Sequence, residues 1–272
     1  MNPEPHIVTS VSNPAIKEIH GLRMRKERKR TGLFLAEGER LLREAQELGY
    51  APEILIYDQA ARDDHFVRAL TAEAFANKAR VIETSAKVLE KIASKDNPQQ
   101  VIGVFRQIAR SFSEIDPAAA PLWAAAEEIR DPGNLGTLIR TADAVKAGGI
   151  ILIGTTCDPF SVEAVRATMG SLFAVPIYAG TREEAVELFA RWPGIVVGSA
   201  LQTSLDYREV RYTAPALILA GSERYGLSDE IRTACHQLVR LPMLGRADSL
   251  NLSVAASILL YAALADQQAD AS

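Results

Sequence analysis

The sequence predicts an α/β protein with two domains. Short apolar runs of strand length alternate with longer segments of helical periodicity along most of the chain. In the second half these runs are apolar throughout, which is typical of parallel strands buried on both faces of a sheet. Between the halves, residues 109–121 lose all periodicity and contain Pro117 and Pro121, so we interpret this segment as a linker. The predicted domains therefore span residues 1–108 and 122–272.

The first half predicts a small α/β domain of about one hundred residues that follows a basic arm. A helix is expected over residues 37–48, because Leu41, Leu42 and Ala45 form one apolar stripe and Gly49 follows as a terminator. The remaining elements are expected as strands at 53–57, 81–83 and 100–105, and as helices at 60–77 and 85–93.

The second half alternates more regularly. Strands are expected at residues 122–126, 150–153, 175–178, 195–198, 216–220 and 238–241. Helices are expected at 135–146, 162–169, 182–191 and 229–235, and a last one begins at 252. Apolar strands joined by helical crossovers predict a parallel sheet that is covered on both faces.

Composition and charge exclude several classes of protein. An apolar fraction of 48% is ample for packed cores. The longest nearly apolar stretch, residues 254–265, is too short to span a bilayer, and the N-terminus lacks the features of a signal peptide. We therefore expect a cytoplasmic protein with no membrane partner. Cys157 and Cys235 are isolated and the four histidines are scattered, so no disulfide framework and no metal site is indicated.

The net charge of −4 conceals one strongly basic segment. Residues 22–30 read LRMRKERKR, in which Glu27 is the single acid. Such a run is usually a solvated helix face, but inside an acidic protein it also forms a local anion site, and phosphate backbone is the commonest large anion. The candidate nucleic-acid-binding residues are Arg23, Arg25, Lys26, Arg28, Lys29 and Arg30.

Three polar turns in the second half follow apolar strands and open helical patterns. They cover residues 131–136, 221–226 and 249–253. A polar residue at a helix start is often only a cap, and in the last turn Ser249, Asn251 or Ser253 could supply it. However, loops at the carboxyl ends of parallel strands gather at one edge of a sheet. The three turns can therefore meet in one crevice.

Common nucleotide-binding and hydrolase motifs do not explain these turns. Gly221 and Gly226 have the spacing of a phosphate-binding loop, but Leu227 stands where its lysine is needed and Glu223 would repel phosphate. The chain has no GxGxxG at a first strand-to-helix turn, no GxSxG and no HExxH.

Arg140 is the remaining charged group of interest. It lies six residues after Asn134, among the apolar residues of a predicted helix. An arginine in an apolar stripe needs an anionic partner or a ligand. Either Glu223 or Asp143 could be a structural partner, but the polar turns favour a functional role.

A family resemblance rests on these residues. The stretches DPGNLGTLIRTADA, LILAGSERYGLSDEI and LPMLGRADSLNLSVAASILLY resemble, in order and spacing, the three signature motifs of the SpoU (TrmH-type) branch of the SPOUT RNA methyltransferases. The strong resemblance covers roughly residues 122–264. The first hundred residues resemble the substrate-binding domain that often precedes this catalytic domain in ribosomal RNA 2′-O-methyltransferases.

The resemblance implies an α/β knot, S-adenosyl-L-methionine as cofactor, and a homodimer whose active site is completed across subunits. The general tendency of chains to avoid knots would not predict this topology. The implied catalytic residues are Asn134, Arg140, Glu223, Ser249 and Asn251. The implied cofactor-binding residues are Leu219, Ala220, Gly221, Leu241, Pro242, Met243 and Leu250.

The implied reaction is 2′-O-methylation of a ribose in structured RNA. A guanidinium stays protonated, so we expect Arg140 to act as an electrostatic clamp instead of a base. Ser249 and Asn251 would orient the nucleotide or fix their loop, and Glu223 would anchor the loops or hold Arg140. A basic arm and a separate first domain suit a large structured RNA, which favours 23S-type ribosomal RNA over transfer RNA. The alternatives are a ribose 2′-O-methyltransferase that acts on transfer RNA, and a non-catalytic RNA-binding factor for ribosome assembly.

Two residues depart from the pattern of many relatives. Lys146 stands where many have glycine after the first-motif helix, and Ser222 stands where many have asparagine before the glutamate. Neither removes a group that the chemistry needs.

Overall fold

The computed structural model describes residues 4–93 and 99–270, and the chain divides into two compact units. Unit 1 comprises Met1–Gln107 together with Asp158–Phe173. Unit 2 comprises Ile108–Cys157 and Ala174–Ser272. The outermost residues of the two predicted domains, 1–3 and 271–272, lie outside the described part of the chain.

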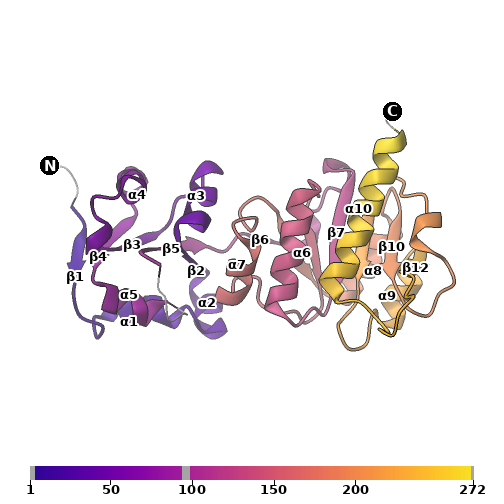
Figure 1. Ribbon diagram of the computed structural model, residues 1–272, viewed down its shortest axis with the longest axis horizontal. Coiled ribbons are helices and arrows are strands. Elements are labelled where there is room, and N and C mark those ends of the chain that lie inside the picture. Colours follow the sequence, from indigo (N-terminus) through magenta and orange to yellow (C-terminus); the bar gives the residue numbers. More distant parts are fainter. Residues whose placement is uncertain (1–3, 94–98, 271–272) are drawn as a thin grey trace. The chain divides into compact units, whose positions relative to one another are not determined.

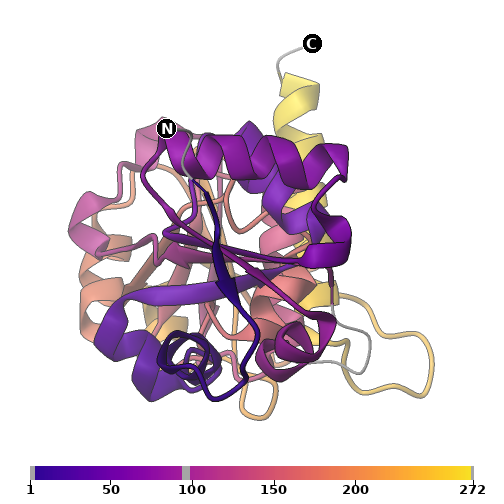
Figure 2. The same cartoon turned by 90° about the vertical axis from the view of Figure 1, so that its left-hand side faces the viewer.

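Unit 1 is built on a mixed sheet of five strands in the order β1-β4-β3-β5-β2 (Figure 2, with the edge strand β1 in indigo at the front). β1, β4 and β3 are parallel, whereas β5 runs antiparallel to both β3 and β2. The strands are β1 (His6–Val8), β2 (Leu33–Glu37), β3 (Ile54–Asp58), β4 (Arg80–Thr84) and β5 (Val101–Arg106). The helices are α1 (Pro14–Gly21), α2 (Arg25–Thr31), α3 (Glu39–Glu47), α4 (His65–Ala76) and α5 (Ala86–Ile92).

The sequence interpretation missed several elements at the start of unit 1. Strands β1 and β2 and helix α1 lie where only an arm and the start of a helix were expected. Asn13 caps α1 by accepting from the backbone N–H of Ala15, and Pro14 occupies the first helical position. These elements are short, so their periodicity is weak. The signal was the cap pair Asn13-Pro14 and the apolar run of β2.

Helix α7 (Val162–Thr168) forms as expected but packs in a different place. The second domain was expected to contain it, whereas it packs on β2 in unit 1. Phe160 and Phe173, at the two ends of this segment, have ring centroids 5.1 and 6.1 Å from that of Phe34. Periodicity identifies an apolar helix face, but it does not tell which sheet that face covers.

Unit 2 contains a parallel sheet of seven strands in the order β12-β10-β11-β7-β8-β9-β6. The strands are β6 (Ala109–Arg110), β7 (Leu122–Glu127), β8 (Ile150–Ile153), β9 (Ile177–Gly180), β10 (Val196–Ser199), β11 (Ala216–Ala220) and β12 (Gln237–Val239). The parallel sheet is as predicted, with bounds of β7, β9, β10 and β12 shifted by one or two residues.

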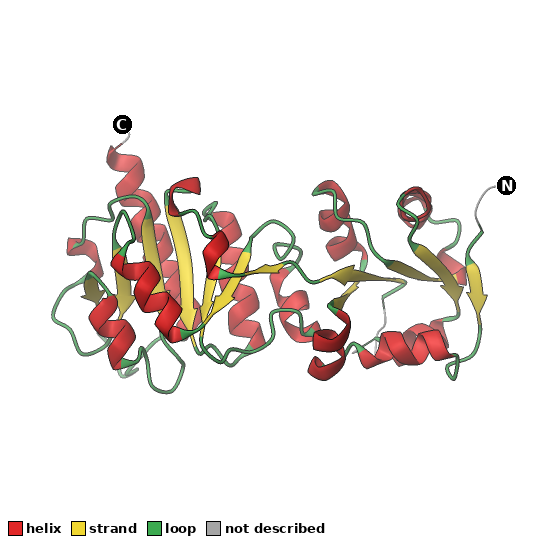
Figure 3. Cartoon of the chain, turned by 180° about the vertical axis from the view of Figure 1, so that it is seen from behind, coloured by secondary structure: helices red, strands yellow, loops and turns green. Residues whose placement is uncertain are grey.

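Helices cover both faces of this sheet (Figures 1 and 3). One face carries α6 (Pro132–Ala144) and α10 (Leu252–Asp270), which pack against each other, and α10 lies over β7 and β11. The other face carries α8 (Arg182–Ala190) and α9 (Asp229–Ala234). Its core includes Trp123 and Trp192, whose rings meet edge to face at 5.8 Å. The last helix thus returns from the edge strand β12 to the middle of the sheet.

The segment expected to be a linker is partly ordered within unit 2. β6 extends the sheet beyond β9, and two short 3-10 turns follow at Phe112–Glu114 and Pro117–Ala119. The indole N–H of Trp123 donates to the carbonyl of Pro117 at 3.1 Å. Elements of two or three residues leave no periodic pattern in a sequence, which explains why they were not expected.

Candidate active site

The first polar turn begins helix α6 and positions Asn134. Asp131 is the N-cap, and its Oδ1 accepts from the backbone N–H of Asn134 at 2.7 Å. Pro132 occupies the first helical position, where its missing N–H is not needed. The cap fixes the first turn of the helix, so the amide of Asn134 projects from a rigid backbone.

Glu223 in the second turn bonds back to the first. Its Oε1 accepts from the side-chain amide of Asn134 at 3.1 Å and from the backbone N–H of Asp131 at 3.4 Å. Its Oε2 accepts from the backbone N–H of Arg130, also at 3.4 Å. A carboxylate at the N-terminus of a helix is favoured by the helix dipole and by the free N–H groups there. Glu223 therefore anchors the second turn on the start of α6, as expected.

Asn251 connects the third turn to Asn134. Its side-chain amide donates to Oδ1 of Asn134 at 2.8 Å. Its own Oδ1 accepts from the backbone N–H of Ser253 at 2.9 Å and from the hydroxyl of Ser253 at 2.6 Å, which caps α10. Asn251 thus serves both as a cap and as a link between loops. Asn134 is the residue that joins all three turns.

A cavity of about 290 Å³ lies between the second and third turns and the end of β10. Its wall includes Glu223 and Ser249, and apolar side chains at Leu241, Leu250 and Leu252. Five of the seven expected cofactor-binding residues line it: Ala220, Gly221, Leu241, Met243 and Leu250. Leu219 is fully buried in the core on the opposite face of β11, and Pro242 is exposed and does not line the cavity.

The sequence interpretation missed one wall of the cavity. Ser199, Ala200, Leu201 and Gln202 line it from the loop that follows β10. β10 is parallel to β11 and lies beside it, so the carboxyl ends of the two strands meet at the same edge. The signal was the strand VVGS itself, because by the same rule its carboxyl end belongs to the crevice.

Close backbone packing shapes the second turn. A Cβ built on Gly221 would lie 2.1 Å from the carbonyl carbon of Gly226 and 2.2 Å from the backbone nitrogen of Leu227. Ser222 and Gly226 exchange two backbone hydrogen bonds at 2.9 and 3.0 Å, and Gly226 has a positive φ of 69°. Both glycines are therefore required by the turn itself, independently of any phosphate.

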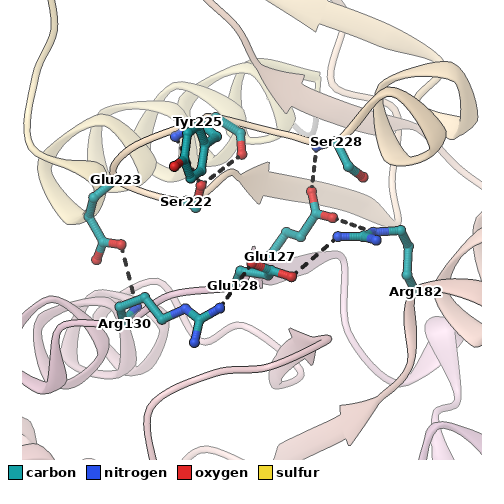
Figure 4. Close-up of polar contacts among 9 residues, drawn as sticks. Glu127, Glu128, Arg130, Arg182, Ser222, Glu223, Tyr225 and Ser228 are labelled. Carbon is teal, nitrogen blue, oxygen red and sulfur yellow. Dashed lines mark hydrogen bonds and ion pairs between the residues drawn. The ribbon is translucent and has the colours of Figure 1, made fainter.

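Glu127, at the end of β7, ties the second turn from below (Figure 4). Its carboxylate is 2% exposed, and it accepts from the backbone N–H of Ser228 at 2.8 Å and from Nε of Arg182 at 2.7 Å. Arg182 also reaches Glu128, which pairs with Arg130. The bond to Glu127 is the main cause that raises the pKa of Arg182. Sequence reasoning did not find this network, because it joins residues about 55 and 101 positions apart.

Arg140 does not lie where the sequence interpretation put it. Leu138, Ile139 and Ala142 are buried against the sheet, whereas Arg140 is exposed on the other side of α6. At about 100° per residue, the side chain of Arg140 points roughly away from the direction shared by those three. Among the residues that the structure describes, Arg140 has no ion pair, so neither Glu223 nor Asp143 is its partner. It does not line the cavity in its own chain.

The basic run forms helix α2 in unit 1, and one of its six cations must be reassigned. Arg28 is 3% exposed and is bound on all sides: Nε and Nη2 pair with Asp158 at 2.8 Å, and Nη1 donates to two backbone carbonyls. It holds the fold together and is not available to RNA. Five of the cations are exposed: Arg23, Arg25, Lys26, Lys29 and Arg30. These five remain the candidate RNA contacts.

The structure explains how Lys146 and Ser222 are accommodated. Lys146 has a left-handed backbone, with φ of 53°, directly after the C-cap of α6. Glycine adopts this conformation without strain, whereas a residue with a Cβ does not. Ser222 accepts the backbone N–H of Tyr225 on its hydroxyl at 3.1 Å. The hydroxyl of Ser222 is therefore the acceptor that stabilises the turn.

The described residues contain no cluster of three or more histidine, cysteine or acidic side chains that could hold a metal ion. In the same part of the chain, none of the helices has the length and apolar character needed to cross a membrane. Both findings apply to the described residues alone.

These features define the class of the protein. A parallel sheet, with three polar loops bonded together at its carboxyl edge around a cavity, is a small-molecule site of an α/β enzyme domain. A second α/β unit precedes it. The chain belongs to the SpoU rRNA Methylase family, whose profile matches residues 121–261. The profile of the MRM3-like substrate binding domain matches residues 13–103.

Three relatives illustrate the similarity. The chain is 42% identical to an AdoMet-bound rRNA methyltransferase from Sinorhizobium meliloti, with a TM-score of 0.88 over 94% of this chain and 96% of that one. It is 32% identical to a 23S rRNA (uridine(2479)-2′-O)-methyltransferase from Streptomyces viridochromogenes, over 88% of this chain and 85% of the relative. It is 29% identical to the 23S rRNA (guanosine(2553)-2′-O)-methyltransferase RlmP of Bacillus subtilis (strain 168), over 93% and 97%. The expected family, fold class, enzyme class and cofactor are confirmed.

Proposed function

We propose that this protein methylates the 2′-hydroxyl of a ribose in 23S ribosomal RNA, with S-adenosylmethionine as the methyl donor. One observation supports it most strongly: Asn134 joins the three polar turns beside a cavity that could accept the donor. The names of the relatives support the choice of ribosomal RNA. The proposed place of action is the cytoplasm.

The chemistry of the cavity wall suits the proposed cofactor. The volume of the cavity, about 290 Å³, is near the lower end for small-molecule pockets. Apolar side chains such as Leu241 and Leu252 suit the face of an adenine ring, and Ser199, Gln202 and Ser249 offer hydrogen-bonding groups. The end of β11 and the second turn add backbone amides and carbonyls. These residues would hold the cofactor.

The chemical task of the chain is mainly one of positioning. The bound cofactor supplies a methyl group on a sulfonium, which is already a good leaving group. The residues must align the ribose oxygen with that methyl group and stabilise the charge that develops as the hydroxyl loses its proton. Ser249, exposed on the cavity wall, is placed to contact the nucleotide. Asn251 and Glu223 hold the loops through Asn134, so they act as positioning residues.

The second part of the proposal is a homodimer in which Arg140 acts on the active site of the partner subunit. Arg140 is exposed, charged and directed away from the core of its own unit, so a role in chemistry requires a second chain. There the guanidinium would stabilise the RNA phosphate and the developing alkoxide.

An exposed apolar stripe on α10 supports this dimer. Val254 is 45% exposed and Tyr261 is 52% exposed, and Ile258 between them is half-buried. At helical spacing these three side chains lie on one face of α10, opposite the face that packs on the sheet. α10 also contacts α6 through the hydroxyls of Ser257 and Thr141, 2.8 Å apart. A second copy of the same two helices would cover the stripe by two-fold symmetry.

Mixed dimers test the shared site. Arg140→Ala and Ser249→Ala subunits, each inactive alone, are co-expressed with different tags and the heterodimer is purified. If Arg140 acts across the interface, one of the two sites in each heterodimer is intact, so about half of the wild-type activity returns. If Arg140 acts within its own subunit, both sites carry one lesion and no activity returns.

The substrate is tested by mapping ribose methylation across all stable RNAs in cells with and without the gene. The proposal predicts that one 2′-O-methylated position in 23S ribosomal RNA disappears and returns on complementation. Loss of a methyl group from a transfer RNA, with 23S ribosomal RNA unchanged, would show that the proposed substrate is wrong.

A non-catalytic RNA-binding factor is the second alternative that the sequence left open, beside a methyltransferase that acts on transfer RNA. Calorimetry with S-adenosylmethionine distinguishes this factor from the proposed enzyme. The proposed enzyme binds the cofactor with a Kd of about 1 mM or tighter, whereas a pure assembly factor shows no binding.

A further inference from the structure

Tyr225 has an unusual position for an aromatic side chain. It is 78% exposed, although tyrosine normally buries most of its ring. It lies at the tip of the second turn and lines the cavity. Its hydroxyl has no hydrogen-bond partner among the residues that the structure describes. An exposed ring beside a ligand cavity is a candidate for contact with a ligand.

The turn holds this ring outward through the backbone. The hydrogen bonds between Ser222 and Gly226 close the turn, and the N–H of Tyr225 donates to the hydroxyl of Ser222 at 3.1 Å. Gly226 supplies the positive φ that the turn requires. None of these bonds uses the side chain of Tyr225. The ring is therefore presented on a preformed support, and its removal leaves the support intact.

The surroundings of the ring are cationic and apolar. The guanidinium carbon of Arg224 lies 5.1 Å from the ring centroid, and Arg232 also lines the cavity. Leu201, on the cavity wall, is 58% exposed. Leu244 directly follows the wall residue Met243 and is 98% exposed. Glu223, the acid of the turn, is bonded to the start of α6.

We propose that Tyr225 is a stacking platform for an unstacked base of the RNA substrate, and that Arg224 binds the adjoining phosphate. The inference deepens the proposed function and rests on it. Proteins recognise single-stranded RNA by stacking splayed bases on aromatic rings and guanidinium planes. A ribose whose 2′-hydroxyl must reach the cavity brings its own base or a neighbouring base to the rim. Tyr225 and Arg224 are the aromatic and the cation that the rim offers.

The same unit supplies a matched control. Tyr207 and Arg208 form a second tyrosine–arginine pair, with 5.8 Å between the guanidinium carbon and the ring centroid. Neither residue lines the cavity. Tyr207→Ala therefore removes a comparable pair away from the proposed site.

The first experiment measures steady-state kinetics on full-length unmodified 23S ribosomal RNA transcript, and the Kd for S-adenosylmethionine by calorimetry. For Tyr225→Ala we expect the KM for RNA to rise roughly 5- to 100-fold, the range for loss of one stacked base. Tyr225→Phe and Tyr207→Ala should change that KM less than about two-fold. The Kd for S-adenosylmethionine should stay within about two-fold in all three variants. A weakened cofactor Kd in Tyr225→Ala, with an unchanged KM for RNA, would instead assign the ring to the cofactor and overturn the inference.

A second readout does not depend on turnover. In Tyr225→Trp the new indole should be quenched when the transcript binds, whereas Trp123 and Trp192 are buried and give a constant background. If wild-type protein methylates the transcript but Tyr225→Trp shows no quenching, the stacking inference fails while the proposed function stands. If wild-type protein methylates no ribosomal RNA, the proposed function fails, and quenching by the transcript still shows whether the ring contacts RNA.

Dissociation of the dimer in Tyr225→Ala, seen by light scattering, would assign the ring to a subunit interface and would also overturn the inference.

Discussion

Asn134 donates its side-chain amide to Glu223 at 3.1 Å, which joins two loops that lie 89 residues apart in the sequence. The same side chain accepts the amide of Asn251 from 117 residues away. One residue at the start of α6 thus holds together the three turns around the cavity. The geometry of the cavity therefore depends on this junction.

Glu223→Ala should therefore weaken cofactor binding as well as catalysis. The substitution removes the acceptor of two backbone N–H groups and of Asn134, with an expected loss of about 1 kcal/mol in the free energy of unfolding. Calorimetry with S-adenosylmethionine and urea unfolding measure the two effects. Glu223→Gln keeps one acceptor oxygen and should lie between wild type and Glu223→Ala. An unchanged cofactor Kd in Glu223→Ala would show that the junction does not support the cavity.

Glu127→Ala should lower the free energy of unfolding more than Glu223→Ala does. The change leaves Arg182 and the backbone N–H of Ser228 without their buried acceptor, and breaking a buried pair typically costs about 3 kcal/mol or more. The exposed pair of Arg106 with Glu53 is the control, because Arg106→Ala should cost less than about 1 kcal/mol. Urea unfolding of both variants decides the point. Equal costs would contradict the assignment of Glu127 as a buried anchor.

Lys146→Gly should stabilise the protein. Lys146 has a left-handed backbone that costs a side chain with a Cβ about 1 kcal/mol relative to glycine. We expect the free energy of unfolding to rise by about that amount, with methyl transfer unchanged. Thermal or urea unfolding checks the gain, and Lys146→Ala, which keeps the Cβ, should show none. A destabilised Lys146→Gly would indicate that the lysine side chain makes a contact worth more than the backbone strain.

Cys235 should react slowly with thiol reagents in the folded protein. Burial raises the pKa of its thiol to about 12, and the charge of Glu127 adds to the shift. The thiolate is the reactive form and Cys235 is only half-buried, so a Cys157→Ser variant should react with Ellman's reagent at pH 8 much more slowly before unfolding than after it. Because the folded pKa lies above the ordinary value of 9.0, the neutral thiol contributes stability that is complete below pH 9 and is lost as the pH rises toward 12. Rapid reaction in native buffer would contradict this burial.

The sequence predicted the parallel sheet and the meeting of the three turns, because apolar strand runs and the carboxyl-edge rule are local or general properties. It did not predict the place of α7, because the partner of an apolar helix face depends on distant residues such as Phe34. It also misplaced Arg140 within the apolar stripe, although counting about 100° per residue separates it from Leu138 and Ala142. Arg28 looked like any other cation of its run, since only the fold brings Asp158 beside it. The bond between Glu127 and Ser228 has no sequence signature.

The most direct test of the central claim is methyl incorporation into unmodified 23S ribosomal RNA by Arg140→Ala, measured beside calorimetry with S-adenosylmethionine. Arg140 is exposed on α6, so the variant should fold, dimerise and bind the cofactor as wild type does. Loss of an electrostatic clamp on a developing oxyanion should lower kcat by about 100-fold or more, and Arg140→Lys should recover only part of it. Full activity in Arg140→Ala would contradict the account, because the site would then work without the guanidinium proposed to stabilise the reacting ribose oxygen.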